Sequence, residues 1–132
     1  MAYRHGDYAQ SKAFGEKALA ASLGDENAYC LARSLNKLGQ AKRAEVLVRA
    51  AIEALKKATP DEVVSVGSLN SVLGESLSTQ HRFADAETLL LAAYQTQKAH
   101  VLPQEYKFIE TRQRLAELYR AWGKTGEAKK YE

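Results

Sequence analysis

The sequence predicts an all-α protein in which antiparallel helix pairs stack into a solenoid, and three observations support this. First, the strong helix formers Ala, Leu, Glu, Lys and Arg supply 69 of the 132 residues. Second, only seven valines and two isoleucines are present, which disfavours a β-rich fold. Third, one pattern of small and large side chains recurs along the chain at a fixed interval. The length suits one domain with its own core, over residues 1–132.

The recurring pattern has a period of 42 residues. Leu31, Leu73 and Leu115 stand at this interval, and each is followed by a small residue. Because a single helix pair cannot bury both of its apolar sides, the repeated units are expected to stack. The other positions that keep their size class are Ala32, Gly74 and Ala116; Leu35, Leu77 and Tyr119; Ala44, Ala86 and Ala128; Leu47, Leu89 and Tyr131; and Ala51 and Ala93.

A shorter copy of the pattern comes first, at an interval of 33 residues. At this offset Gly6 aligns with Gly39, and Leu19 aligns with Ile52. We therefore expect a partial first unit that lacks its first helix and turns at residues 6–8. The four expected units cover about residues 1–24, 25–58, 60–100 and 103–132, and the last is also partial.

Within the second unit, apolar residues recur at helical spacing between Ala28 and Leu38. Gly39 then ends the helix, because glycine takes a left-handed cap conformation without steric penalty. Helical spacing resumes from Ala44 to Leu55.

The third unit starts after Pro60, a residue that suits a first helical turn. Its first helix is predicted to end near Thr79 and its second to run from Phe83 to about Lys98, around a turn at residues 80–82.

The fourth unit is predicted to be helical from about Gln104 to Ala121, with a turn at residues 123–124. The small residues at 32, 74 and 116 are expected to face those at 44, 86 and 128 across the turns. Replacing Ala86 with Leu would overpack such a crossing and cost roughly 1–3 kcal/mol.

Composition and charge exclude several classes of protein. The net charge is +3, divided as +2 before and +1 after residue 66, so there is no basic stripe for nucleic acid. The longest apolar run, Leu89–Tyr94, is too short to cross a membrane. Residues 1–10 contain no apolar signal segment, and the single Cys30 cannot form an internal disulfide. We expect a cytoplasmic protein.

No catalytic, cofactor-binding or metal-binding constellation is found, so we expect no enzyme within these residues. The turn Gly123-Lys124-Thr125 resembles part of a phosphate loop, but Leu118 stands where the loop needs its first glycine. Cys30 is expected to pack in a helix pair, and Trp122 to close the end of the core or to act as an interface hot spot. The histidines are expected to be solvated: His5, His81 and His100.

Two stretches carry a resemblance to the tetratricopeptide repeat (TPR) family. They are Leu73-Gly74-x-x-Leu77 with Phe83 and Ala86, and Leu115-Ala116-x-x-Tyr119 with Gly123 and Ala128. The 42-residue period is similar to that of the kinesin-light-chain-like subclass. The resemblance implies a right-handed solenoid that binds other proteins. The chain departs from the family pattern at Ala41 and Thr125, where an aromatic residue is usual, and at His81, which replaces the turn glycine.

The resemblance implies that the first helix of each pair lines a concave surface. Polar residues on these helices that are not needed for packing are therefore candidates to bind a peptide or a partner helix. The alternative is that they form only the solvated side of amphipathic helices. The candidates are Tyr29, Arg33, Asn36, Lys37, Ser71, Glu75, Ser78, Thr79, Gln113, Glu117 and Arg120.

Charges among the candidates indicate the kind of partner. Arg33, Asn36 and Lys37 resemble the carboxylate-binding clamps of some co-chaperones, but Glu75 and Glu117 stand where further cations would be needed. We therefore expect a protein or peptide of mixed charge.

Two further expectations concern the ends of the chain. Because terminal units present uncapped apolar faces, either end-to-end self-association or a protective rearrangement of the ends is expected. The stretch 114–132 also resembles the C-terminal tails of some bacterial multidomain serine/threonine kinases. The alternative function is therefore that of a regulatory TPR segment of a larger bacterial signalling enzyme.

Overall fold

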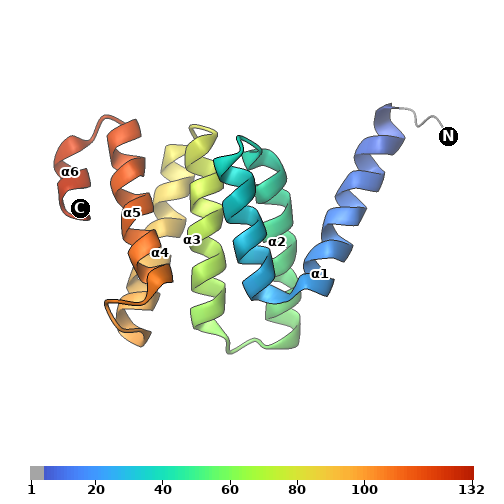
Figure 1. Cartoon of the computed structure of the whole chain (residues 1–132), viewed down its shortest axis with the longest axis horizontal. Helices are drawn as coiled ribbons and strands as arrows, with labels where there is room; N and C mark the ends of the chain where they lie inside the picture. Colours follow the sequence, from blue (N-terminus) through green and yellow to red (C-terminus); the bar gives the residue numbers. More distant parts are fainter. Residues whose placement is uncertain (1–4) are drawn as a thin grey trace.

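The computed structural model describes the backbone of residues 5–132 and the side chains of residues 19, 20 and 22–132. This part of the chain is all-helical and contains no strand (Figure 1). The prediction of an all-α protein is therefore confirmed. The six helices are α1 (His5–Lys37), α2 (Ala41–Ala58), α3 (Val63–Thr79), α4 (Phe83–His100), α5 (Tyr106–Ala121) and α6 (Thr125–Lys129).

Each helix packs against its neighbours in the chain, and the odd-numbered helices also pack on one another. Helix α3 contacts α1 on one side and α5 on the other, as well as α2 and α4. Helix α2 runs antiparallel to α1, and α4 antiparallel to α3 (Figure 1). The part of α1 after residue 24, together with α3 and α5, therefore forms a row of three helices that run in the same direction (Figure 1).

Helix α1 is bent at Gly24, which has φ 79° and ψ 170°. Before this residue the helix projects away from the rest of the molecule (Figure 1). The expected turn at residues 6–8 is wrong, because α1 is helical from His5 onward. Gly6 lies inside this helix, where glycine is tolerated at a cost of about 1 kcal/mol relative to alanine. The side chains expected to repeat before residue 19 lie outside the described residues.

The three turns that follow α1, α3 and α5 lie where the sequence predicts them. Their central residues, Gly39, His81 and Gly123, all have positive φ, of 78°, 62° and 82°. This conformation lets the next amide reach back and cap a helix carbonyl five residues earlier. The bonds are Gln40 N–H to Leu35 O (2.8 Å), Arg82 N–H to Leu77 O (2.9 Å) and Lys124 N–H to Tyr119 O (2.7 Å).

The periodic positions form the core. All are buried except Leu31, Leu89 and Tyr131, which are half-buried. Among the described glycines, Gly74 has the closest neighbour, because an added Cβ would lie only 2.6 Å from the Leu90 side chain of α4. Leu90, one turn beyond the expected Ala86, is thus the side chain closest to Gly74, and the missing Cβ lets α3 and α4 approach.

Candidate functional site

The row formed by α1, α3 and α5 places most of the predicted site residues together. Two adjoining cavities, of about 100 and 40 Å³, lie across this row and share Lys37, Glu75, Arg114 and Glu117. Each of the three helices contributes to both cavities. Eight of the eleven predicted residues line one or both: Arg33, Asn36, Lys37, Glu75, Ser78, Thr79, Gln113 and Glu117.

Tyr29 and Ser71 do not line these cavities, and their placement corrects the sequence-based interpretation. The sequence predicts that both are free of packing, yet Tyr29 is 1% and Ser71 0% exposed. Asn36 reaches a cavity wall but is also buried. These polar side chains lie in the contacts between α1, α3 and α5, so they hold the helices together rather than face a partner.

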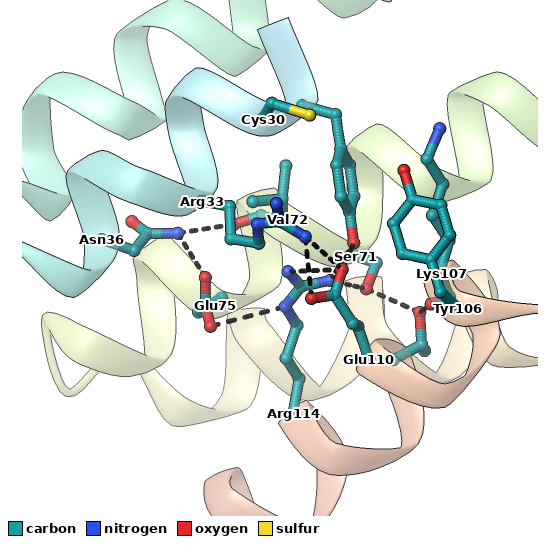
Figure 2. Close-up of polar contacts among 12 residues, drawn as sticks. Cys30, Arg33, Asn36, Ser71, Val72, Glu75, Tyr106, Lys107, Glu110 and Arg114 are labelled. Atoms are coloured by element: carbon teal, nitrogen blue, oxygen red, sulfur yellow. Dashed lines mark hydrogen bonds and ion pairs between the residues drawn. The ribbon is translucent and has the colours of Figure 1, made fainter. Parts of the chain in front are cut away.

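Arg114 of α5 is the centre of this buried polar contact. It is 5% exposed and donates hydrogen bonds to the hydroxyls of Tyr29 (2.8 Å) and Ser71 (2.9 Å). Its Nε lies 3.5 Å from a carboxylate oxygen of Glu75. Figure 2 shows Arg114 rising from α5 between Glu75 and Glu110. One guanidinium therefore links α5 to both α1 and α3.

Glu110 and Glu75 complete the contact from the acceptor side. Tyr29 donates a hydrogen bond of 2.6 Å to Glu110, and Arg33 donates to both oxygens of the same carboxylate at 3.2 and 3.0 Å. Asn36 donates to Glu75 at 2.8 Å (Figure 2). Glu75 is thus held by the structure, although it was predicted as a residue for binding a partner.

Sequence reasoning missed Arg114 and Glu110. At the 42-residue period, Arg114 occupies the same position as Cys30 and Val72, and Val72 is fully buried. A charged residue at a position with apolar equivalents is a signal that was available. Glu110, four residues earlier on the same helix, could have been found as its partner.

Burial and a neighbouring carboxylate both raise the pKa of Tyr29 at this contact. Burial is the main cause that raises the pKa of Tyr29 well above its ordinary value of 10.0, and the bond to Glu110 adds to it. The hydroxyl therefore stays protonated and able to donate at physiological pH.

A second set of polar contacts joins α1 to α5 near residue 26. Tyr106 donates to Glu26 at 2.7 Å, and Lys107 forms an ion pair with the same carboxylate. The hydrogen bonds from Lys107 and then Tyr106 hold the pKa of Glu26 below 4.5. Burial and the bond to Glu26 raise the pKa of Tyr106 to about 12. Helices α1 and α5 are therefore joined directly here.

Arg120, the remaining predicted residue, lies in a different surface depression of about 400 Å³, which is formed by α5 and by Tyr131 and Glu132 after α6. It forms an ion pair of 3.0 Å with Glu132. Gln113 and Glu117 line both this depression and at least one of the cavities described above.

The structure also shows where Trp122 and two of the histidines lie. Trp122 is half-buried and stacks on Phe83, with ring centroids 5.7 Å apart, as expected for an aromatic residue at the end of the core. His81 and His100 are exposed, whereas the His5 side chain lies outside the described residues. Within the described part, no three His, Cys, Asp or Glu side chains are grouped to hold a metal ion.

No protein-family model matches the chain, and no curated protein shows significant similarity to it. Across the described residues, none of the helices has the combination of length and hydropathy needed to cross a bilayer.

Proposed function

We propose that the protein is a non-catalytic scaffold that binds a peptide or partner helix on the surface formed by α1, α3 and α5. The observation that carries this proposal is the convergence of eight polar residues, from three helices, on two adjoining cavities. Several of them, including Lys37, Gln113 and Glu117, are exposed. In a binding site, correctly placed polar groups fix the orientation of the bound segment.

The finer architecture belongs to the same proposal. Stacked pairs in a right-handed, TPR-type solenoid would place the odd-numbered helices side by side on the concave surface. Contacts of α3 with both α1 and α5, and burial at the 42-residue period, support this arrangement. The alternative, a regulatory segment of a larger signalling enzyme such as a serine/threonine kinase, stays a prediction from the resemblance of the last residues.

The test is selection of binding peptides from a random peptide library, followed by affinity measurements with variants. Substituting Glu75 is unsuitable because it would disturb the contact with Arg114 and Asn36. The variants Thr79→Ala and Gln113→Ala change exposed cavity residues and should each weaken binding of selected peptides about fivefold or more. Thr88→Ala, at an exposed position on α4 away from both cavities, is the matched control.

Selected peptides whose affinity is lowered by the cavity variants and not by the control support the proposal. Peptides that bind equally well to all variants, or a library that yields no binder, would contradict it.

A further inference from the structure

The larger of the two cavities lies at the carboxyl ends of three parallel helices. Asn36 and Lys37 are the last residues of α1, and Ser78 and Thr79 are the last of α3. Glu117 stands one turn before the end of α5. Aligned peptide dipoles give each helix a partial negative charge at its carboxyl end, which favours a cation nearby. The carboxyl ends of the three helices lie at the same end of the row (Figure 1), and residues at or near each of these ends line the cavity.

The side-chain charges around the cavity leave one carboxylate uncompensated. Arg114 contacts Glu75 at 3.5 Å, and Lys37 contacts the same carboxylate at 3.7 Å. Arg33 is engaged by Glu110 at 3.0 Å. Glu117, in contrast, is exposed and forms no hydrogen bond or ion pair with any described residue. The Glu117 carboxylate therefore remains available to accept a hydrogen bond or an ion pair from a ligand.

The cavity has room for the end of one side chain. Its volume is about 100 Å³, whereas a site of roughly 10–15 Å³ already admits a water molecule. Tyr106 and Lys107 close the opposite end of the row through Glu26. Ser78, Thr79 and Glu117, which line the cavity, lie near the carboxyl ends of α3 and α5, away from this contact.

We propose that this cavity receives the positively charged side chain of a lysine or arginine carried by the partner, with the Glu117 carboxylate as its ion-pair acceptor. This inference rests on the proposed function, because it presumes that the surface binds a peptide. It names the chemistry of the partner at one position, where a basic side chain fits both the free carboxylate and the three helix ends.

The test uses short capped peptides of glycine, serine and alanine with one central residue that is arginine, lysine, citrulline or glutamate. Citrulline has nearly the shape of arginine but carries no charge. Each peptide is titrated into the ¹⁵N-labelled full chain, and amide shifts are followed by NMR. The arginine or lysine peptide should shift the amides of Ser78, Thr79 and Glu117, and citrulline and glutamate peptides should bind at least fivefold more weakly. Comparing the affinities of the arginine and lysine peptides shows which of the two cations the cavity prefers.

Variants assign the effect to one carboxylate. Glu117→Gln should lower affinity for the basic peptide about fivefold to tenfold, as expected for loss of a charge-assisted hydrogen bond. Glu117→Lys should reverse the preference toward the glutamate peptide. Glu53→Gln is the matched control, because Glu53 is an exposed carboxylate on α2 that pairs with Lys57. Position 117 is exposed, so all variants should keep the thermal midpoint of the parent protein.

The outcomes separate the inference from the proposed function. If the citrulline peptide shifts the same amides with the same affinity as the arginine peptide, or if Glu117→Gln changes nothing, the basic-residue inference is wrong and the proposed function stands. If no peptide shifts any amide around the two cavities, the basic-residue inference is wrong, and the proposed function is wrong as well only if the random library also yields no binder.

Discussion

Two charged side chains, Arg114 and Glu45, are buried and held by partners from other parts of the chain. Glu45 of α2 is 8% exposed and accepts hydrogen bonds from Arg82 and Gln80, which lie in the turn between α3 and α4, and from Arg49. Removing one member of such a contact leaves a buried charge without compensation. These residues therefore fix the position of α2 and α5 relative to the rest of the molecule.

Glu45 predicts a pH-dependent stability. Burial disfavours its charged form, but the hydrogen bonds from Gln80, Arg49 and Arg82 outweigh burial and hold its pKa below 4.5. Because the folded-state pKa is lowered, the stabilisation is present above pH 4.5 and is lost as pH falls through the lower folded value. Glu45→Gln should lower the free energy of unfolding by roughly 2 kcal/mol at pH 7.

The measurement for Glu45 is urea denaturation of parent and variant at pH 7 and at pH 3. The difference between the two proteins should shrink at the lower pH. Glu53→Gln, at an exposed position on the same helix, should change stability little at either pH. A difference for Glu45→Gln that stays constant with pH contradicts the assignment.

His81 predicts a stabilising substitution. Its φ of 62° lies in the left-handed region that glycine adopts without penalty, and the equivalent turns use Gly39 and Gly123. Left-handed backbone costs a non-glycine residue roughly 1–2 kcal/mol. The edge contact of His81 with Phe83, at 5.4 Å, recovers part of this cost. His81→Gly should therefore raise the free energy of unfolding by about 0.5–1 kcal/mol.

Thermal unfolding of His81→Gly, compared with His100→Gly as a control outside the turns, measures this effect. His100 is exposed at the end of α4, where no positive φ is required. An unchanged or lower midpoint for His81→Gly would show that its backbone carries no strain.

At the scale of helices, the spacing of α3 and α4 depends on the absence of one side chain. A Cβ at residue 74 would lie 2.6 Å from Leu90, closer than non-bonded carbon atoms approach. Gly74→Ala should lower the free energy of unfolding by about 1–3 kcal/mol. In a double-mutant cycle, Gly74→Ala should cost clearly less when Leu90 is already Ala, because the overlap is then removed.

Chemical denaturation of the four proteins in this cycle gives the interaction energy. Gly126→Ala is the control, because a Cβ there has no neighbour within 4 Å. Strictly additive effects of the substitutions at 74 and 90 would mean that the two residues do not limit the helix spacing.

The helices and turns were largely predictable because they depend on local sequence. Gly39 and Gly123 mark turns through their backbone freedom, and the period located the third turn although His81 stands there. The burial of Tyr29 and Ser71 was not predictable in this way. It depends on Arg114, which is 85 residues from Tyr29 in the sequence. The 42-residue period therefore predicts where the helices and turns lie. It does not predict contacts between the first helices of units that are two apart, such as the contact of Tyr29 with Arg114.

At the scale of the whole molecule, the row of α1, α3 and α5 is closed at one end and open at the other. Glu26 joins α1 to Tyr106 and Lys107 near the start of α5. Near the carboxyl ends of the same helices, the contacts leave the two cavities. The cavities that we propose as the binding site therefore lie away from the contact at Glu26.

The open face of α5 predicts end-to-end self-association. Helix α4, with 18 residues, covers α3 along its length, whereas α6, with 5 residues, covers only part of α5. Ile109 is left 36% exposed beside a depression of about 400 Å³ that also includes Ala116 and Tyr131. Because Ile109 and the half-buried Tyr131 offer apolar contacts between the charged residues of this depression, we expect the mass measured by sedimentation equilibrium to rise with protein concentration.

Ile109→Glu should keep the protein monomeric over the same concentration range, because the association would bury an unpaired charge. Val63→Glu is the matched control, since Val63 is a 49% exposed apolar residue at the start of α3, away from this face. A parent protein that is strictly monomeric at high concentration, or one that associates equally well with Glu at 109, would show that the open face of α5 does not mediate contact between copies.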